Sequence, residues 1–319
     1  MSVDEKQSTA DTTSSTLSKV EQTSLFMAAG RAIESRKPES ERAFYDPYAE
    51  IFAGTRGFEQ LDRIIKTLKI PKPEMFHAHI TFRTKYFDDM IKAAVGKIEK
   101  KCEEKGIKKL PKLQVVILGV GCDTRSYRLD ILKGCHVFEV DMGDVIKFRE
   151  EILAHKCKAK TEAIIKSVAG DLNDLEKFNL GDALIKQGYD TDNSVSIWIC
   201  EGLISYLSSS SLDRVFRLAS DTLCCKNETW KDLNLNWFVA NCLNENTPVE
   251  DHLQQSLNVT FKSSFKTPHV LLEKYGYKEW SVVPSGGKCK DYKNDYLKQV
   301  ENSANVRELA ISFFFYGCK

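Results

Sequence analysis

The sequence predicts an α/β fold in which a mostly parallel sheet is covered by helices on both faces. Short apolar runs rich in Val and Ile alternate with longer stretches of helical periodicity, which is typical of parallel strands joined by crossover helices. Four of these runs end at a glycine or an acidic residue, as strands that lead into a ligand site do. The chain has 319 residues and is 42% hydrophobic, which is enough to bury a substantial core.

The region before the first strand, 20–112, is predicted to be helical. Apolar residues recur at helical spacing from Val20 to Ser35, and Pro38 stops that helix. A long helical pattern then runs from Glu74 to about Lys101. The polar segment 1–19 has no such periodicity, and we expect it to be a disordered tail.

Four strands are predicted in the middle of the chain, and helical patterns at 143–156 and 209–225 lie between or after them. Each strand is four to seven residues long and is rich in β-branched residues, as buried parallel strands are. The predicted strands are Leu113–Leu118, Val137–Val140, Ile164–Ala169 and Ser194–Cys200.

The last third of the chain is expected to add three strands and to complete a single domain, 20–319, with its sheet core at 113–319. Residues 244–267 are typical of an insertion that carries helix and loop, and Pro268–Tyr275 suits a helix. The last two strands have no long helix between them, so we expect an antiparallel pair that closes the sheet edge. The three strands are Leu233–Val239, Lys278–Val283 and Glu308–Tyr316.

The composition argues against several classes of partner. Lys and Arg total 46 and Asp and Glu total 45, so the net charge of +1 gives no electrostatic reason to expect nucleic acid or an anionic membrane. Ten scattered cysteines without a CxxC pair indicate reduced thiols, and no spacing is typical of a zinc site. There is no signal-like apolar run in the first 19 residues and no segment long enough to span a bilayer. We therefore expect a cytoplasmic protein without a metal.

The first predicted strand leads into a tight turn at Gly119 and Gly121, where glycines let the backbone approach a ligand closely. A dinucleotide fingerprint would place a third glycine where Thr124 stands, and would leave the helix start free for a pyrophosphate. Asp123 puts a carboxylate there, which is unfavourable beside phosphates and favourable beside a sulfonium or an ammonium. The loop therefore favours S-adenosylmethionine over NAD, although Asp123 could also simply cap the next helix.

Acidic residues follow the next three strands. Asp141 stands about 20 residues past the glycines, where a carboxylate can accept both ribose hydroxyls, and Glu139 is a competitor on the same face of the strand but one step deeper. Asp171 could bind the adenine amino group while Leu172 packs against the ring. Glu201 should lie over the same crevice, because the carboxyl ends of parallel strands meet at one edge of a sheet.

Arg83 falls on the apolar stripe of the long helix, three residues after Ile80 and four before Phe87. A guanidinium facing the core is costly unless it is paired. It could receive the carboxylate of the cofactor's methionine part through bidentate geometry. It could instead reach water with its head group, or form an internal ion pair with Asp123 or Glu201.

Candidates for catalysis are weaker. His79 lies one turn before Arg83, and Tyr206 follows Glu201 closely, but packing would also explain both residues. The sequence offers no obvious buried base. This favours a carboxylate acceptor, which is ionised at neutral pH, over a hydroxyl, which needs a base.

Several motifs, taken as a set, resemble the leucine carboxyl methyltransferase family over residues 20 to about 225. The motifs are Thr23-Ser-Leu25, Arg31-Ala-Ile-Glu-Ser35, Asp46-Pro-Tyr-Ala-Glu50, Leu118-Gly-Val-Gly-Cys-Asp-Thr-Arg125, Arg128-Leu129, Phe138-Glu-Val-Asp141, Gly170-Asp-Leu172 and Cys200-Glu-Gly-Leu-Ile-Ser-Tyr-Leu207. The resemblance implies a Rossmann-like, class I methyltransferase sheet of seven strands, the last antiparallel. It also implies S-adenosylmethionine held by Arg83, Gly119, Asp141, Asp171, Leu172 and Glu201, with Arg31 as a further contact.

We therefore expect an S-adenosylmethionine-dependent O-methyltransferase that acts on a carboxylate of a small molecule or of a protein C-terminus. Members of the family act on the C-terminal leucine of a phosphatase, on small molecules or on a tRNA base. The motif from Arg31 to Ser35 looks more like the broad bacterial-type branch with unassigned acceptors. Two alternatives stay open, an NAD-dependent oxidoreductase on a similar sheet and a non-catalytic module that binds the cofactor.

Overall fold

The structure is a computed structural model, and it describes residues 19–245, 252, 254–255, 257, 259–285 and 312–319. Apart from Lys19, the tail predicted to be disordered lies outside these residues. The helices are α1 (Lys19–Ser35), α2 (Ala49–Thr67), α3 (Pro73–Glu104), α4 (Arg125–Arg128), α5 (Gly143–Glu151), α6 (Leu180–Lys186), α7 (Ser209–Arg217) and α9 (His269–Lys274). The strands are β1 (Lys112–Leu118), β2 (His136–Asp141), β3 (Ile164–Ala169), β4 (Ser194–Cys200), β5 (Trp237–Leu243), β6 (Glu279–Pro284) and β7 (Ser312–Cys318).

The strands form one seven-stranded sheet in the order β3-β2-β1-β4-β5-β7-β6. The first five strands pair in parallel, and β7 runs antiparallel to both of its neighbours, β5 and β6. The predicted fold class, a mostly parallel sheet of seven strands with the last antiparallel, is therefore confirmed. The expected antiparallel pair does close one edge, with β6 outermost and β7 inserted between β5 and β6.

The predicted strands match closely in the middle of the chain and less well near its end. β3 and β4 have the predicted bounds, and β1 and β2 are one or two residues longer. The prediction of a strand at Leu233–Val239 was wrong at its start, because Asn234 has a left-handed φ of 52° and the chain only becomes extended at Trp237. The first four residues of the predicted last strand, 308–311, lie outside the described residues.

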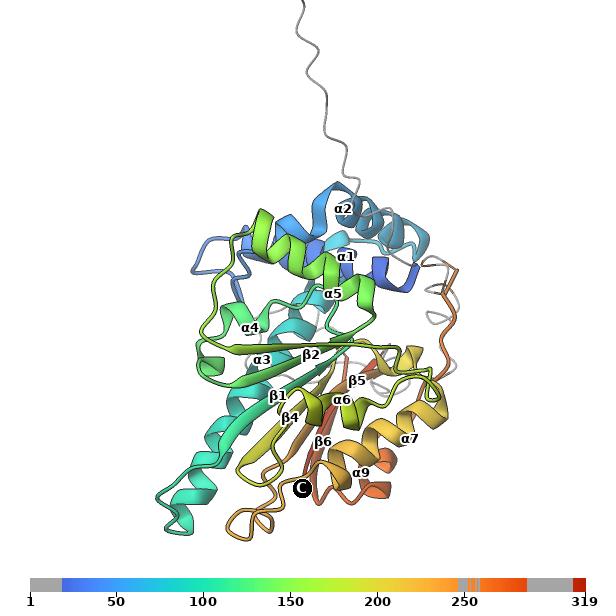
Figure 1. The fold of residues 1–319 in the computed structure, drawn as a ribbon. Coiled ribbons are helices and arrows are strands. Elements are labelled where there is room, and N and C mark those ends of the chain that lie inside the picture. The colour runs from blue at the N-terminus through green and yellow to red at the C-terminus, as the bar shows by residue number, and fades with distance from the viewer. Residues whose placement is uncertain (1–18, 246–251, 253, 256, 258, 286–311) are drawn as a thin grey trace, which may run out of the picture.

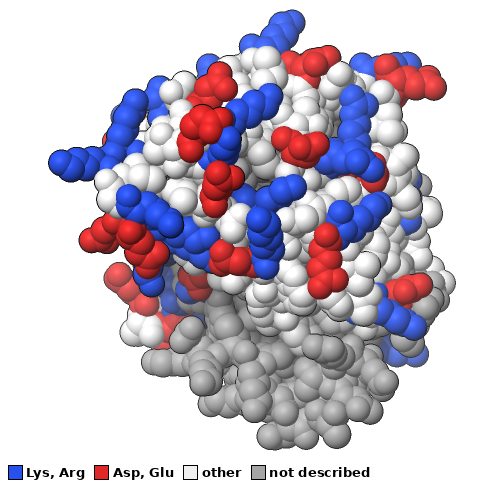
Figure 2. Space-filling model, turned by 90° about the horizontal axis from the view of Figure 1, so that it is seen from below, with Lys and Arg blue, Asp and Glu red and all other residues white. Residues whose placement is uncertain are grey.

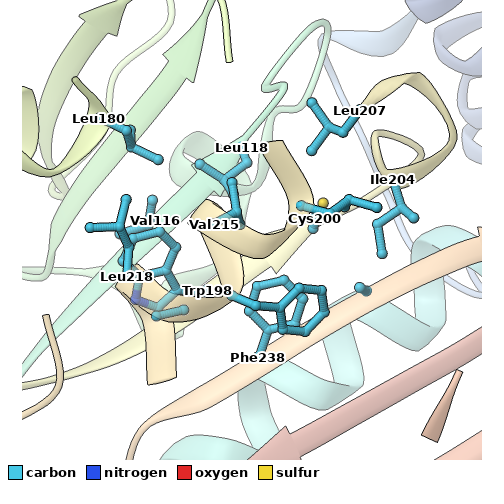
Figure 3. Close-up of a cluster of buried hydrophobic side chains, with 14 of the residues drawn as sticks. Val116, Leu118, Leu180, Trp198, Cys200, Ile204, Leu207, Val215, Leu218 and Phe238 are labelled. Carbon is cyan, nitrogen blue, oxygen red and sulfur yellow. The ribbon is translucent and has the colours of Figure 1, made fainter. Parts of the chain in front are cut away.

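Alternation along the strands gives the sheet two apolar faces. On one face, Val116, Trp198 and Phe238 pack with α6 and α7, which supply Leu180 and Val215 among others (Figure 3). On the other face, the alternate residues of the same strands pack against the long helix α3 and against α5. Figure 1 shows α6, α7 and α9 on one side of the sheet and α3 on the other.

Helices α1 and α2 pack together at one end of the sheet (Figure 1). Helix α2 lies in the region 20–112 that was predicted to be helical, but the sequence analysis gave no bounds for it. Gly54 has a non-helical φ of 49°, so the helical periodicity breaks in the first half of α2. Gly57 has a packing role, since a Cβ at this position would lie 2.6 Å from the backbone oxygen of Leu25 in α1. The two helices can therefore approach closely only because residue 57 lacks a side chain.

Basic and acidic side chains are interspersed on the molecular face seen in Figure 2, in keeping with the balanced charge of the chain. Within the described ranges, no helix combines the length and the apolarity needed to cross a bilayer.

Candidate functional site

A cavity of about 350 Å³ lies at the carboxyl ends of β1, β2, β3 and β4, and α1 forms one of its walls. These four strands are neighbours in the sheet, so the residues that follow them meet at one place. All nine residues predicted to contact a cofactor line the cavity: Arg31, Arg83, Gly119, Gly121, Asp123, Asp141, Asp171, Leu172 and Glu201. Helix α1 also contributes Thr23, Ser24, Phe26 and Met27 to the lining, four residues that the sequence analysis did not assign to the site.

The loop after β1 owes its shape to its glycines. Gly119 and Gly121 have left-handed φ angles of 63° and 46°, which other residues adopt only with strain. A Cβ on Gly121 would also lie 2.9 Å from the Cβ of Ser24 in α1. The loop therefore turns tightly and lets α1 approach its backbone.

Asp141 holds this loop in place. Its Oδ2 accepts a hydrogen bond from the Gly121 backbone N–H at 2.8 Å, and its Oδ1 accepts one from the Met142 N–H at 2.8 Å. Burial raises the pKa of Asp141 to about 6, although both of these backbone donors lower it. Each carboxylate oxygen can accept more than one hydrogen bond, so both keep capacity toward a ligand.

The competitor Glu139 has a structural role. It is buried, and its carboxylate accepts hydrogen bonds from Arg149 Nε at 3.0 Å and Nη2 at 2.6 Å and from the Ser126 hydroxyl at 2.8 Å. Arg149 Nη1 also donates to the backbone oxygens of Gly121 and Asp123. The Glu139–Arg149 pair therefore joins the glycine loop to β2 and α5. Glu139 is not among the described residues that line the cavity.

Glu201 lies between two arginines. Arg83 Nε donates to its Oε1 at 2.7 Å, and Arg125 Nη1 lies 2.6 Å from its Oε2. Burial by itself would raise the pKa of Glu201, but Arg125 and then Arg83 outweigh it and bring the pKa to about 2. Of the alternatives for Arg83, the structure contains the ion pair with Glu201, which engages Nε. Arg83 still lines the cavity. A Cβ at position 202 would lie 2.1 Å from Arg83 Nη2, so the guanidinium has room there only because residue 202 is glycine.

Asp123 precedes Thr124, the N-cap residue of α4, and its carboxylate binds the first residue of that helix. Its Oδ1 accepts the Arg125 backbone N–H at 2.7 Å, and its Oδ2 accepts from Arg125 Nη1 at 2.5 Å. Arg125 Nε donates further to Asp88 of α3 at 2.7 Å, and Arg128 donates to both oxygens of the same carboxylate. Asp123 therefore both binds the start of α4 and lines the cavity.

Arg31 joins α1 to the glycine loop. Its Nε donates to Asp46 at 2.9 Å and its Nη2 to the Cys122 backbone oxygen at 2.5 Å. Asp46 also accepts from the Thr124 hydroxyl at 2.7 Å. In the sequence analysis Asp46 was part of a motif that carries the resemblance and had no role of its own. Asp88 was missed, although its place next to Phe87 of the apolar stripe was a detectable signal.

The two weak catalytic candidates have different positions. Tyr206 lines the cavity, and its ring contacts that of Phe261 with centroids 5.3 Å apart. His79 is not among the described residues that line the cavity, and its ring lies near the rings of Phe76 and Phe314. Burial, with Arg83 nearby, lowers the pKa of His79 to about 4, so the imidazole is neutral at physiological pH.

The far rim of the cavity comes from residues that the sequence analysis had not assigned to the site. Leu203 and Leu207 follow β4, and Thr260 and Lys262 belong to the predicted insertion. Within the part of the chain that the structure describes, no group of three His, Cys, Asp or Glu residues is arranged to hold a metal ion. The site thus combines backbone and arginine donors, carboxylate acceptors and an apolar wall.

A family model described as leucine carboxyl methyltransferase matches residues 24–220. A protein of Mycobacterium tuberculosis (strain ATCC 25618 / H37Rv), named as a candidate S-adenosyl-L-methionine-dependent methyltransferase, is 34% identical over 200 residues, which are 61% of this chain and 59% of the relative. A relative of the same description from Mycobacterium bovis (strain ATCC BAA-935 / AF2122/97) is 35% identical over 209 residues, 63% of this chain and 57% of the relative. The match spans less than two thirds of these curated relatives.

Two solved structures share the fold. One is a candidate methyltransferase from Thermobifida fusca, with a TM-score of 0.53, 15% identity and coverage of 93% of this chain and 94% of the other. The second is a DUF574 family protein from Streptomyces avermitilis, with a TM-score of 0.51, 11% identity and coverage of 92% and 96%. At these identities the likeness concerns the fold alone.

Proposed function

The chain belongs to the leucine carboxyl methyltransferase family, and from that premise we propose that it is an S-adenosylmethionine-dependent methyltransferase whose cofactor occupies the cavity at the ends of β1 to β4. The observation that carries this proposal is the meeting of all nine expected cofactor contacts in one cavity. The curated relatives bear names of the same activity.

Each part of the cofactor has a suitable partner in the cavity. The two oxygens of Asp141 suit the ribose hydroxyls, since each can accept a hydrogen bond beyond the one it receives from the backbone. Asp171 and Leu172 suit the adenine amino group and ring. Arg83 donates a hydrogen bond from Nε to Glu201, and its terminal nitrogens suit the methionine carboxylate. When bound, S-adenosylmethionine supplies a sulfonium-bound methyl group for in-line displacement by an acceptor oxygen.

We propose a carboxylate as the acceptor, from a small molecule or a protein C-terminus. A carboxylate is ionised at neutral pH and needs no base. Among the described residues that line the cavity there is no histidine, and burial raises the pKa of the Tyr206 hydroxyl. Hydroxyl chemistry would require a group that accepts a proton near neutral pH. In the described lining, Asp141 has a pKa of about 6, but we assign its carboxylate to the ribose hydroxyls, so it is not free to act as that base.

The protein's part in the reaction is then to align the reacting atoms and to exclude water from them. When nucleophile, methyl and sulfur are well aligned, the alignment alone lowers the activation free energy by about 7 kcal/mol. The wall formed by Phe26 and Met27 of α1 lowers the polarity of the cavity.

A cytoplasmic setting fits the nine described cysteines, which are free thiols.

Ligand-induced stabilisation tests the identity of the cofactor. S-adenosylhomocysteine at ten times its dissociation constant should stabilise the fold by about 1.4 kcal/mol, and NAD at the same concentration should leave it unchanged. Thermal melts with each ligand measure this directly. A shift with NAD alone would favour the oxidoreductase alternative, and no shift with either ligand would remove the proposed cofactor from the cavity.

The raised pKa of Asp141 predicts a pH dependence of cofactor binding. With a pKa of about 6, the carboxylate loses its charge as the pH falls, and a protonated carboxyl is a poorer acceptor for hydroxyl groups. The affinity for S-adenosylhomocysteine should fall about tenfold between pH 7.5 and pH 5, where only about a tenth of the groups stay ionised. Calorimetric titration across this range checks the profile. Asp141→Asn should bind more weakly and with a flatter profile; a flat profile in the wild type would separate Asp141 from the ligand.

A further inference from the structure

The segment from Val259 to Thr267 is fixed to the loop that follows β4. The Lys262 backbone N–H donates to the Ser205 oxygen at 2.6 Å, and the Ser263 hydroxyl donates to the Leu207 oxygen at 2.8 Å. On either side, the ring of Phe261 contacts that of Tyr206, and the Phe265 N–H donates to an oxygen of β5 at 3.0 Å. The segment is therefore held against the cavity as a second wall, on the loop that also carries Glu201.

The charges of the cavity lining single out Lys262. The four arginines of the lining each have a carboxylate within 4.0 Å: Arg31 has Asp46, Arg83 has Glu201, and Arg125 and Arg128 share Asp88. The Lys262 ammonium has no carboxylate partner among the residues that the structure describes. It is an exposed cation in the lining of a cavity whose four described arginines each have a carboxylate of the protein as a partner.

The side chains around Lys262 indicate the kind of molecule that would use it. Leu203, Leu207 and the ring of Tyr206 line the cavity on the loop to which the Lys262 segment is bonded. An ammonium next to apolar side chains suits an anionic group attached to an apolar body, because the body leaves water while the charge finds a partner.

We propose that Lys262 is the specificity-determining residue for the acceptor, and that it binds the carboxylate of an acceptor with an apolar body. This inference rests on the proposed methyltransferase function. One carboxylate oxygen pairs with the Lys262 ammonium, and the other forms the new O–CH₃ bond as the S–CH₃ bond breaks. The bonding electron pair goes to sulfur, so a carboxylate and a sulfonium become a neutral ester and a neutral thioether, and no proton is released.

Binding of defined acids to protein saturated with S-adenosylhomocysteine tests this assignment. The probes are linear monocarboxylates from octanoate to tetradecanoate, each compared with its primary amide by calorimetric titration. We expect at least one acid to bind ten-fold or more tightly than its amide, since the amide lacks the charge. Lys262→Gln should abolish this preference, and Lys262→Arg should retain most of it because the positive charge stays.

The control variant is Lys266→Gln, which removes an exposed lysine of the same segment that is not in the described cavity lining. It should keep the wild-type preference. S-adenosylhomocysteine affinity, measured first in every variant, reports separately on the proposed function: if the wild type does not bind it, that proposal fails. Three results would overturn the assignment of Lys262. The wild type could bind S-adenosylhomocysteine but prefer no acid over its amide, or the preference could survive in Lys262→Gln. The third such result is that Lys262→Gln loses cofactor affinity as well.

Discussion

Arg149→Met is expected to lower the free energy of unfolding by about 3–5 kcal/mol, the range for removing one partner of a buried ion pair. Arg149 and Glu139 have side chains only 1% and 3% exposed, so the substitution would leave a buried carboxylate without its counter-charge. The glycine loop would also lose the donor to the backbone oxygens of Gly121 and Asp123. Urea denaturation at pH 7 measures the change.

A matched control and a double variant separate this effect from the loss of an arginine as such. Arg217→Met removes an arginine whose side chain is 65% exposed and whose partner is Asp213, and it should denature almost as the wild type does. Glu139→Leu combined with Arg149→Met should recover part of the lost stability, because no charge is then left unpaired in the core. A single variant as stable as the wild type would show that water or another cation reaches Glu139.

Arg83→Lys is expected to weaken binding of S-adenosylmethionine almost as much as Arg83→Ala does. The loss should be about 1.5–3 kcal/mol, as for hydrogen bonds to a charged group, which corresponds to roughly ten- to a hundred-fold in affinity. Lysine offers a point charge, whereas arginine can bind Glu201 through Nε and a ligand carboxylate through its terminal nitrogens at the same time. Calorimetric titration of the three proteins gives the comparison.

Decarboxylated S-adenosylmethionine distinguishes this contact from a purely structural role of the Arg83–Glu201 pair. It lacks the carboxylate, so the wild type and both variants should bind it with similar affinity. Thermal melts without ligand show whether each variant is folded. If both ligands lose affinity equally in the variants, Arg83 acts by holding Glu201, and the proposed carboxylate contact is wrong.

The parts of the fold that the sequence predicted well are those where one physical signal dominates. β3 and β4 were placed at their observed bounds, because both runs are rich in Val and Ile and end sharply at Gly170 and Glu201. The ends of β1 to β4 carry seven of the nine expected site residues, and the other two, Arg31 and Arg83, lie on α1 and α3. Their ligand contacts remain predictions that the titrations above would test.

The missed features depend on contacts between segments far apart in the chain. Helix α2 is shaped by Gly54 and Gly57, and local periodicity does not show that Gly57 faces α1. The ion-pair network of Asp88 with Arg125 and Arg128 joins residues about 40 positions apart, so no local pattern specifies it. Lys262 likewise has no local signal, because the hydrogen bond from its backbone N–H to the Ser205 oxygen joins segments that are far apart in the sequence.

The inner position of β7 has a consequence for how the chain is made. During synthesis the sheet can assemble from β1 to β5 as those strands leave the ribosome, but β6 pairs in the described structure only with β7. Phe313 and Phe315 of β7 also fill the apolar layer on one face, and Phe314 fills the layer on the other. Until residues 312–318 emerge, β5 keeps an open edge and both layers are incomplete, so a nascent chain would present aggregation-prone strand edges. Final closure of this sheet therefore waits for β7, which is translated well after β5.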